Sequence, residues 1–246
     1  MSAVPMMETA QAGISRLFAD ELAHGYRIAG CHRYNGTDGT EAFRVVRLKH
    51  AERDKVIRPM YRDGFRYRMG RPPRPDAGWP LYSPPFPLVE VGPVYVVEGE
   101  ACADALARLG ITATTSGSSS SADAADWEPL RGRSVRLWPD NDAAGAKYAE
   151  AVASRLRAIG CAVETVEADG LPDKGDCVDW LALNPEATAA DVHALPATKV
   201  VKSSEASGPR VILRRGCDVE PTATDWLWPG WLAAGKLHLI GGAPGT

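Results

Sequence analysis

The chain has 246 residues, which is enough for one large or two modest domains with buried cores. It is 45% hydrophobic and 24% charged with a formal net charge of −3, an ordinary composition for a soluble globular protein. No stretch approaches the roughly 18 apolar residues of a membrane span, and the N-terminus lacks the basic start and apolar block of a secretion signal. We therefore expect no membrane association.

The cysteines occur singly and form no C-x-x-C pair: Cys31, Cys102, Cys161, Cys177 and Cys217. This usage predicts a reducing, cytoplasmic setting, because secreted domains of modest size pair their thiols. It also argues against a zinc site built from these thiols, so no zinc is expected.

The first 50 residues predict a helix followed by a hairpin. Residues 1–26 have the pattern of an amphipathic helix, and residues 26–50 alternate in polarity and turn at "NGTDG". The hairpin leads into a strongly basic segment, residues 44–74, in which eleven Arg and Lys face three acids, a local net charge of +8. The rest of the chain is correspondingly acidic.

This basic segment favours a polyanion as ligand. Aromatic residues such as Tyr61, Phe65 and Tyr67 are interleaved with arginines, a mixture suited to phosphate contacts and base stacking on single strands. The predicted nucleic-acid-binding residues are Arg44, Arg47, Lys49, Arg58, Arg62, Arg66 and Arg68. The alternative is a solvated hairpin whose arginines only maintain solubility.

A proline-rich connector, residues 71–87, separates this segment from a region in which strands and helices alternate. The pattern predicts strands at 94–98, 111–115, 134–140 and 162–168, and helices at 101–109, 122–130 and 143–159. Such alternation implies βαβ crossovers. We predict an α/β fold, a parallel sheet with helices on both faces, preceded by a small basic β-rich (α+β) subdomain.

Acidic residues follow the predicted strands. Glu98 ends the first strand, Asp140 and Asp142 end the third, and Asp176 lies in the loop after the fourth. Because the carboxyl ends of parallel strands meet at one edge of the sheet, we expect these carboxylates to lie together. Clustered carboxylates repel one another unless a cation neutralises them, which predicts a site for Mg²⁺ or Mn²⁺. Alternatively, each acid is a solvated strand exit or a helix cap.

The loop "TTSGSSSS" reaches the same edge after the second strand. Backbone N–H groups at Gly117 and Ser118 are candidates for binding a phosphate, and a plain polar loop is the alternative.

Three segments in this order, "VEGEACADAL", "LWPDNDAAG" and "DKGDCVDWL", resemble the Toprim domain of bacterial-type primases, topoisomerases and certain nucleases. The resemblance spans residues 90–185. It implies that Glu98 is a general acid/base and that Asp140, Asp142 and Asp176 bind the metal. Many members have Asp where this chain has Cys102.

The last residues resemble the entry into a RecA-like helicase ATPase. Gly242 and Gly245 match the start of the P-loop pattern, and its Gly-Lys-Ser/Thr would follow Thr246. We therefore expect no ATP hydrolysis from this chain and expect a helicase ATPase domain as its partner. The expected domains are 1–89 (helix and basic subdomain), 90–185 (Toprim), 186–210 (short helix and linker) and 211–246 (start of the ATPase).

A basic β-rich segment, a Toprim domain and a P-loop, in that order, match the layout of phage and plasmid primase-helicases. The resemblance implies Mg²⁺-dependent polymerisation of ribonucleotides on single-stranded DNA, with single-stranded DNA and nucleotides as ligands. Two alternatives stay open: a non-catalytic DNA-binding and docking module for a replicative helicase, and a Toprim nuclease.

Overall fold

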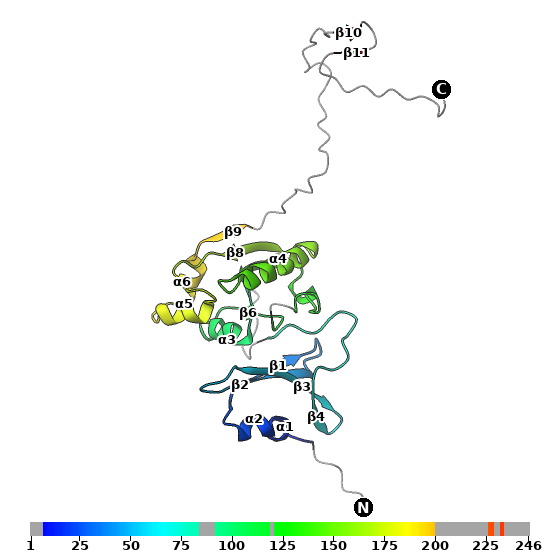
Figure 1. The fold of residues 1–246 in the computed structure, drawn as a ribbon, viewed down its shortest axis with the longest axis vertical. Coiled ribbons are helices and arrows are strands. Elements are labelled where there is room, and N and C mark those ends of the chain that lie inside the picture. Colours follow the sequence, from blue (N-terminus) through cyan, green and yellow to red (C-terminus); the bar gives the residue numbers. More distant parts are fainter. Residues whose placement is uncertain (1–6, 84–91, 119–120, 200–225, 229–231, 234–246) are drawn as a thin grey trace, which may run out of the picture. The chain divides into compact units, whose positions relative to one another are not determined.

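The computed structural model describes residues 7–83, 92–118, 121–199, 226–228 and 232–233 (Figure 1). The chain divides into two compact units, Met1–Val201 and Lys202–Thr246. In the second unit the described residues form one antiparallel pair, β10 (Trp226–Trp228) and β11 (Leu232–Ala233). The predicted linker from residue 200 onward and the P-loop glycines Gly242 and Gly245 lie outside the described residues.

The first unit begins with an antiparallel sheet of strand order β1-β2-β3-β4. Its strands are β1 (Arg27–Asn35), β2 (Glu41–Lys49), β3 (Val56–Asp63) and β4 (Arg66–Met69). The predicted hairpin is confirmed: Gly36 N–H donates to the Thr40 carbonyl (2.8 Å) and Gly39, at φ +77°, closes the turn. A positive φ is easily adopted only by glycine, which explains the residue there.

Two helices, α1 (Ala10–Leu17) and α2 (Ala19–Ala23), cover one face of this sheet. The prediction of one continuous helix is wrong, because the helix is interrupted at Phe18, whose side chain is fully buried. Strand alternation sends Val46 and Leu48 of β2 toward these helices and Phe43 and Val45 toward the opposite face.

The second sheet has strand order β6-β5-β7-β8-β9. Its strands are β5 (Val94–Val97), β6 (Ala113–Thr114), β7 (Ser134–Trp138), β8 (Ala162–Val166) and β9 (Ala197–Lys199). The pairings among β6, β5, β7 and β8 are parallel, whereas β9 pairs antiparallel with β8. The predicted α/β fold is therefore confirmed, with the correction that the sheet is mixed at its edge.

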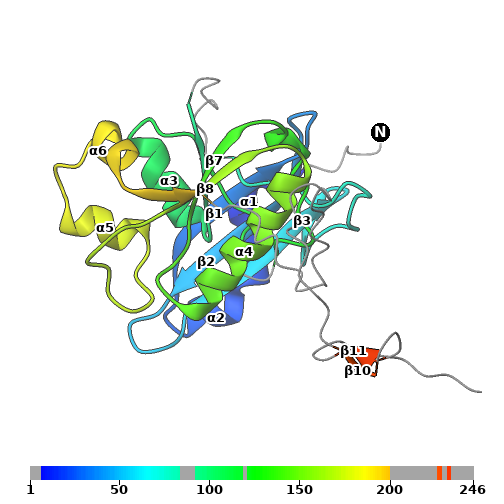
Figure 2. The same cartoon turned by 90° about the horizontal axis from the view of Figure 1, so that it is seen from above.

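Helices pack on both faces of this sheet, as predicted (Figure 2). They are α3 (Glu100–Arg108), α4 (Ala143–Ala158), α5 (Cys177–Leu183) and α6 (Ala189–Ala194). Within β5, Val94 and Val96 join the core beneath α4, whereas Tyr95 and Val97 join the core beneath α3. None of the helices in the described part of the chain is long and apolar enough to cross a bilayer.

The predicted helix at residues 122–130 is wrong. This segment is a turn followed by a single 3₁₀ turn, Glu128–Leu130, with Pro129 in its first positions. The Trp127 indole N–H donates to the Ala122 carbonyl (2.8 Å), and the buried ring packs beneath α4. Burial of this ring, with its N–H donor bonded, stabilises a compact turn. The local sequence pattern alone favours a helix here.

One hydrophobic core joins the two sheets. Tyr34 of β1 stacks on Phe43 of β2 with ring centroids 4.4 Å apart, and both belong to the cluster that contains Tyr95 of β5 and Leu106 of α3. The Tyr34 hydroxyl donates to Oε1 of the buried Glu100 at 2.7 Å. The first sheet is thereby held against the start of α3.

Replacing Tyr34 with Phe should lower the free energy of unfolding by about 1–3 kcal/mol, because the buried Glu100 carboxylate loses its donor. In thermal unfolding we expect a fall in Tm of roughly 2–4 °C per kcal/mol for a domain of this size. Tyr26→Phe is the control, since its hydroxyl donates to an exposed carbonyl, that of Asp54. Equal losses in both variants would contradict a special role for the Tyr34 bond.

Candidate functional site

The predicted acids lie at one edge of the second sheet. Glu98 directly follows β5, and Asp140 and Asp142 follow β7. Because β5 and β7 are adjacent and parallel, with Val97 paired to Trp138, the chain leaves both strands at the same edge. The side chains are close enough that, after burial, the charges of Asp140 and Asp142 contribute to the raised pKa of Glu98.

The loop that carries Asp176 is bonded to the loop that carries Asp140 and Asp142. Asn141 N–H donates to the Gly175 carbonyl (2.8 Å), and Lys174 N–H donates to the Asn141 carbonyl (3.0 Å). The Asn141 side-chain amide also donates to the carbonyls of Leu171 and Pro172. These bonds hold the Asp176 loop beside the end of β7.

Asp142 and Asp176 are also helix caps. Oδ1 of Asp142 accepts from the N–H groups of Ala144 and Gly145 at the start of α4. Oδ1 of Asp176 accepts from the N–H groups of Val178 and Asp179 at the start of α5. In each carboxylate one oxygen makes both of these bonds, so capping does not conflict with a second ligand on the other oxygen.

The first turn of α4 approaches Asp140 very closely. A Cβ atom on Gly145 would lie 2.2 Å from the Asp140 carbonyl oxygen, which is backbone and cannot rotate away. The glycine at this position therefore allows α4 to start where Asp142 can cap it.

The environment of Glu98 and Asp140 disfavours the charged form of both side chains. Burial, and then the charges of Asp140 and Asp142, raise the pKa of Glu98 to about 7. Burial, and then Asp176 and Asp142, raise the pKa of Asp140 to about 6, while Lys55 acts in the opposite direction. Oε1 of Glu98 is buried and has no hydrogen-bond partner among the described residues.

A hard divalent cation fits this donor set. All the candidate ligands are carboxylate oxygens. The charges of Asp140 and Asp142 act on Glu98, whose Oε1 has no hydrogen-bond partner among the described residues, and a cation would reduce the repulsion among these carboxylates. Across the described ranges, no three His, Cys, Asp or Glu side chains converge tightly enough to hold an ion by themselves. Mg²⁺ typically binds in proteins through one or two carboxylates and keeps several waters.

Two of the predicted basic residues line a groove that reaches one of these acids, Asp176. Arg47 and Lys49 of β2 and Arg108 of α3 line a cavity of about 350 Å³ together with Asp176 and Asp179. A second cavity, of about 610 Å³, shares His32, Asp104 and Arg108 with the first and continues along β1. We call the two cavities together the basic groove, after the cations that line it, Arg33, Arg47, Lys49 and Arg108; the acids Asp104, Asp176 and Asp179 also line it.

The other predicted basic residues do not lie in this groove. Arg44 pairs with Glu41 (2.7 Å), and Arg62 donates to the Glu8 carbonyl and the Tyr67 hydroxyl. On the surface Arg58 pairs with Glu21, Arg68 pairs with Asp63, and Arg66 is exposed beside the exposed Phe65.

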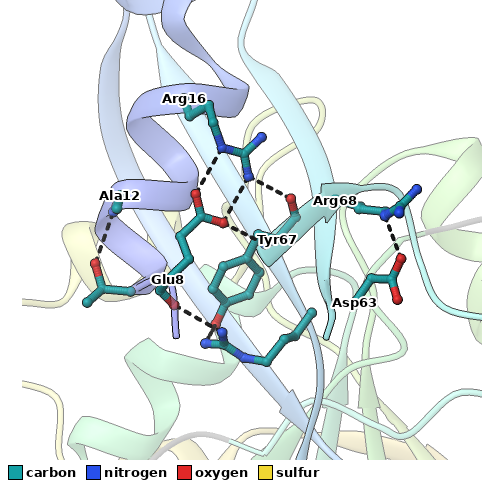
Figure 3. Close-up of polar contacts among 8 residues, drawn as sticks. Glu8, Ala12, Arg16, Asp63, Tyr67 and Arg68 are labelled. Atoms are coloured by element: carbon teal, nitrogen blue, oxygen red, sulfur yellow. Dashed lines mark hydrogen bonds and ion pairs between the residues drawn. The ribbon is translucent and has the colours of Figure 1, made fainter. Parts of the chain in front are cut away.

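Ion pairs within the protein engage charged side chains in and around the basic segment. Figure 3 shows Arg16 and the Tyr67 backbone converging on Glu8, where they lower the pKa of Glu8 to about 2. The same view shows the Arg68–Asp63 pair. The predicted basic residues therefore do not form one continuous binding surface.

Gly117 and Ser118 lie close to Glu98, but their N–H groups are already engaged. Gly117 N–H donates to Thr115 Oγ1 (2.9 Å), and Ser118 N–H donates to Ser121 Oγ (3.0 Å). The Thr115 hydroxyl in turn donates to the Glu98 carbonyl (2.7 Å). Phosphate binding by these N–H groups stays a prediction, and it would require displacing both bonds.

Sequence reasoning missed the contributions of Lys55, Asp179 and Arg108. Lys55 lies within the basic segment, but it is in the loop after β2, where no strand alternation indicates its direction. Arg108 is on the last turn of α3, and only the packing of the first sheet against that helix places it in the basic groove.

The sequence matches no known family, and no relative is found among curated proteins. Among solved structures, the crystal structure of the primase fragment of the bacteriophage T7 primase-helicase is similar at a TM-score of 0.42 and 19% sequence identity. The alignment covers 68% of this chain and 61% of that chain, so the chain spans less than two thirds of its length.

Replacing Glu98 with Gln should stabilise the metal-free protein at neutral pH. The folded pKa of about 7 exceeds the ordinary value of 4.5, so the folded state holds its proton longer than the unfolded state. Stability should therefore fall as pH rises from about 4.5 to 7 in the native chain. Above pH 7 we expect the variant to be more stable by about 1–2 kcal/mol after solvent screening.

Denaturant unfolding at pH 5 and pH 8 would measure this difference, with Glu150→Gln on the exposed surface of α4 as control. A Glu98 variant that is less stable than the native chain at pH 8 would contradict the proposed electrostatic cost.

Replacing Gly145 with Ala should displace the Asp140 backbone and loosen the cap of α4. We expect a loss of about 2 kcal/mol or more, since the methyl group would contact backbone and cannot be accommodated by side-chain rotation. Thermal unfolding would measure it, and Gly160→Ala is an informative comparison. At Gly160 a Cβ has open space, so only the positive φ of +83° opposes the substitution. A Gly145 variant that unfolds like the native chain would contradict the close approach.

Proposed function

We propose that this chain is a Toprim-type primase module that joins ribonucleotides on single-stranded DNA with Mg²⁺ or Mn²⁺. The observation that carries the proposal is the position of Glu98. Its buried Oε1, which has no hydrogen-bond partner among the described residues, lies at the same sheet edge as Asp140 and Asp142. Burial, and then the charges of those two acids, raise the pKa of Glu98 to about 7. A carboxylate with such a pKa is suited to proton transfer at neutral pH.

In the proposed reaction, a strand 3′-hydroxyl attacks the α-phosphorus of a nucleoside triphosphate. A new P–O bond forms, the bond between the α-phosphorus and the bridging oxygen breaks, and pyrophosphate leaves. Glu98 accepts the proton of the hydroxyl. A bound Mg²⁺ would stabilise the charge on the attacking and leaving oxygens. Asp140 and Asp142 would hold it, and Asp176 would complete the acidic edge.

The basic groove supports binding of a nucleic acid strand at this site. Arg47 and Lys49 line the smaller cavity together with Asp176, so phosphates bound by these cations would lie near that acid. Contacts of this kind give affinity that depends strongly on salt and little on sequence. We include a helicase ATPase domain as a proposed partner because of the P-loop-like sequence at Gly242 and Gly245. The proposed setting is cytoplasmic.

A second candidate function is a non-catalytic DNA-binding and docking module. It is favoured by one observation: Asp142 and Asp176 both serve as helix caps, a role that needs no metal. Such a module would bind single strands through the basic groove without making a product.

Changing Asp140 and Asp142 to Ala together should abolish primer synthesis. The assay combines the chain with single-stranded DNA, labelled ribonucleotides and Mg²⁺ or Mn²⁺, and the expected loss exceeds about a hundredfold because metal stabilisation of the transition state is removed. The control, Glu150→Ala with Glu186→Ala, removes the same charge from exposed positions. Synthesis that survives in the double variant would exclude the proposed site, and nicking of plasmid DNA in the same buffer would indicate a nuclease.

Changing Arg47 and Lys49 to Gln should weaken binding of a single-stranded oligonucleotide by roughly tenfold and lower the salt dependence by about one to two ions. Arg58→Gln with Arg68→Gln removes equal charge from residues that are paired with Glu21 and Asp63 outside the groove, and we expect a smaller effect. Fluorescence anisotropy at several salt concentrations would measure both. A larger loss in the second pair would place the strand on β3 and β4 instead.

A further inference from the structure

Arg71 is a fixed cation with uncommitted donors. It follows β4, and its guanidinium carbon lies 5.1 Å from the centroid of the Phe43 ring and 4.6 Å from that of the Trp79 ring. Within the described part of the chain it forms no ion pair or hydrogen bond, although its charge also acts on the nearby Tyr34. The rings hold the group in place while its N–H donors stay available.

The guanidinium lies beside the loop next to Glu98. A Cβ atom on Gly117 would lie 3.7 Å from Nη2 of Arg71. Gly117 N–H is bonded to Thr115, whose hydroxyl is bonded to the Glu98 carbonyl. Arg71 therefore follows the first sheet but reaches the loop after β6, which is bonded to the Glu98 backbone.

The loop itself offers few donors to an anion. The N–H groups of Gly117 and Ser118 are donated to hydroxyls within the loop, so Arg71 supplies the uncommitted donors at this position. A guanidinium presents two parallel N–H groups that match two oxygens of a phosphate.

The carboxylate of Glu100 also lies near the Gly117 loop. Oε1 of Glu100 would also lie 3.7 Å from a Cβ atom on Gly117, but Glu100 forms no ion pair with Arg71 within 4.0 Å and instead accepts from Tyr34. Glu100 thus places negative charge near the site without accepting a hydrogen bond from the Arg71 guanidinium. An alternative role for Arg71 is to offset the charge of this buried acid.

We propose that Arg71 binds a phosphate group beside Glu98, either of a nucleoside triphosphate or of the nucleic acid strand. The position of the site rests on the contacts above, whereas the nucleotide as its ligand rests on the proposed function. Arg71 would be a binding residue that orients the phosphate toward the acids.

The test compares Arg71→Gln, Arg71→Lys and the control Arg74→Gln, an exposed residue of the same segment. Titration calorimetry with inorganic tripolyphosphate, and anisotropy with a single-stranded oligonucleotide, are both done without divalent cations. We expect Arg71→Gln to lose about tenfold in affinity for one of the two ligands, since a charge-assisted bidentate pair is lost. Arg71→Lys should lose less, and Arg74→Gln less than about twofold.

The two probes separate the sources of the phosphate. A loss confined to tripolyphosphate assigns the site to the nucleotide, and a loss confined to the oligonucleotide assigns it to the strand. Unchanged affinity for both ligands, with thermal stability reduced in Arg71→Gln and restored in Arg71→Lys, would overturn the proposal and leave Arg71 as the counter-charge of Glu100.

The same variants separate this proposal from the proposed function. If the native chain makes no primer while Arg71→Gln still weakens phosphate binding, the phosphate site stands and polymerisation fails. If Arg71→Gln fails to fold, the Arg71→Lys variant decides, because it keeps the charge near Glu100 but loses the forked geometry. An affinity in Arg71→Lys equal to that of the native chain would then overturn bidentate binding.

Discussion

The hydrogen bond from the Tyr34 hydroxyl to the buried Glu100 carboxylate is the interaction on which the site depends. Glu100 opens α3 two residues after Glu98, and Tyr34 belongs to β1, so one bond connects the basic sheet to the acidic edge. The surrounding core leaves little room for adjustment, because Tyr34 stacks on Phe43 and a Cβ on Gly117 would lie 2.7 Å from its hydroxyl. A buried carboxylate without a donor costs several times what the bond itself contributes, so the two sheets are held in one arrangement.

This arrangement brings groups of opposite charge together at the acidic edge. The acids follow β5 and β7, whereas Lys55, whose charge acts on Asp140, belongs to the loop after β2 in the first sheet. Part of the repulsion among the carboxylates is relieved by helix capping, since Asp142 and Asp176 accept backbone N–H groups at helix starts, where negative charge is favoured. Among the described residues, Oε1 of Glu98 has no such partner, so this acid keeps its electrostatic cost as an anion.

The sequence predicted elements whose signals are local. The hairpin at residues 26–50 follows from its turn residues, and α4 follows from a long amphipathic pattern that ends at Gly160. The helix expected at 122–130 failed because burial of Trp127 outweighed local propensity. The basic segment predicts a single nucleic-acid-binding surface, but strand alternation places its residues on both faces of the sheet. Arg44 and Arg47 are three apart on β2, so they point to opposite faces, and only Arg47 reaches the groove. The position of Arg71 had no local signal, since it depends on how the first sheet packs on the second.

A polyanion approaching this site meets two kinds of surface. On the basic groove it replaces small counterions, so its affinity there needs no metal and falls with salt. At the acidic edge the same polyanion is repelled by Glu98 and Asp140 until a proton or a divalent cation neutralises them, so occupancy there is linked to both. Asp176 connects the two surfaces, because it shares a cavity with Arg47 and Lys49 and, after burial, is the largest contributor to the raised pKa of Asp140. Under the proposed function, the phosphates of a strand held by the first sheet would complete the coordination shell of a cation bound by these acids, and strand and metal would bind with positive cooperativity.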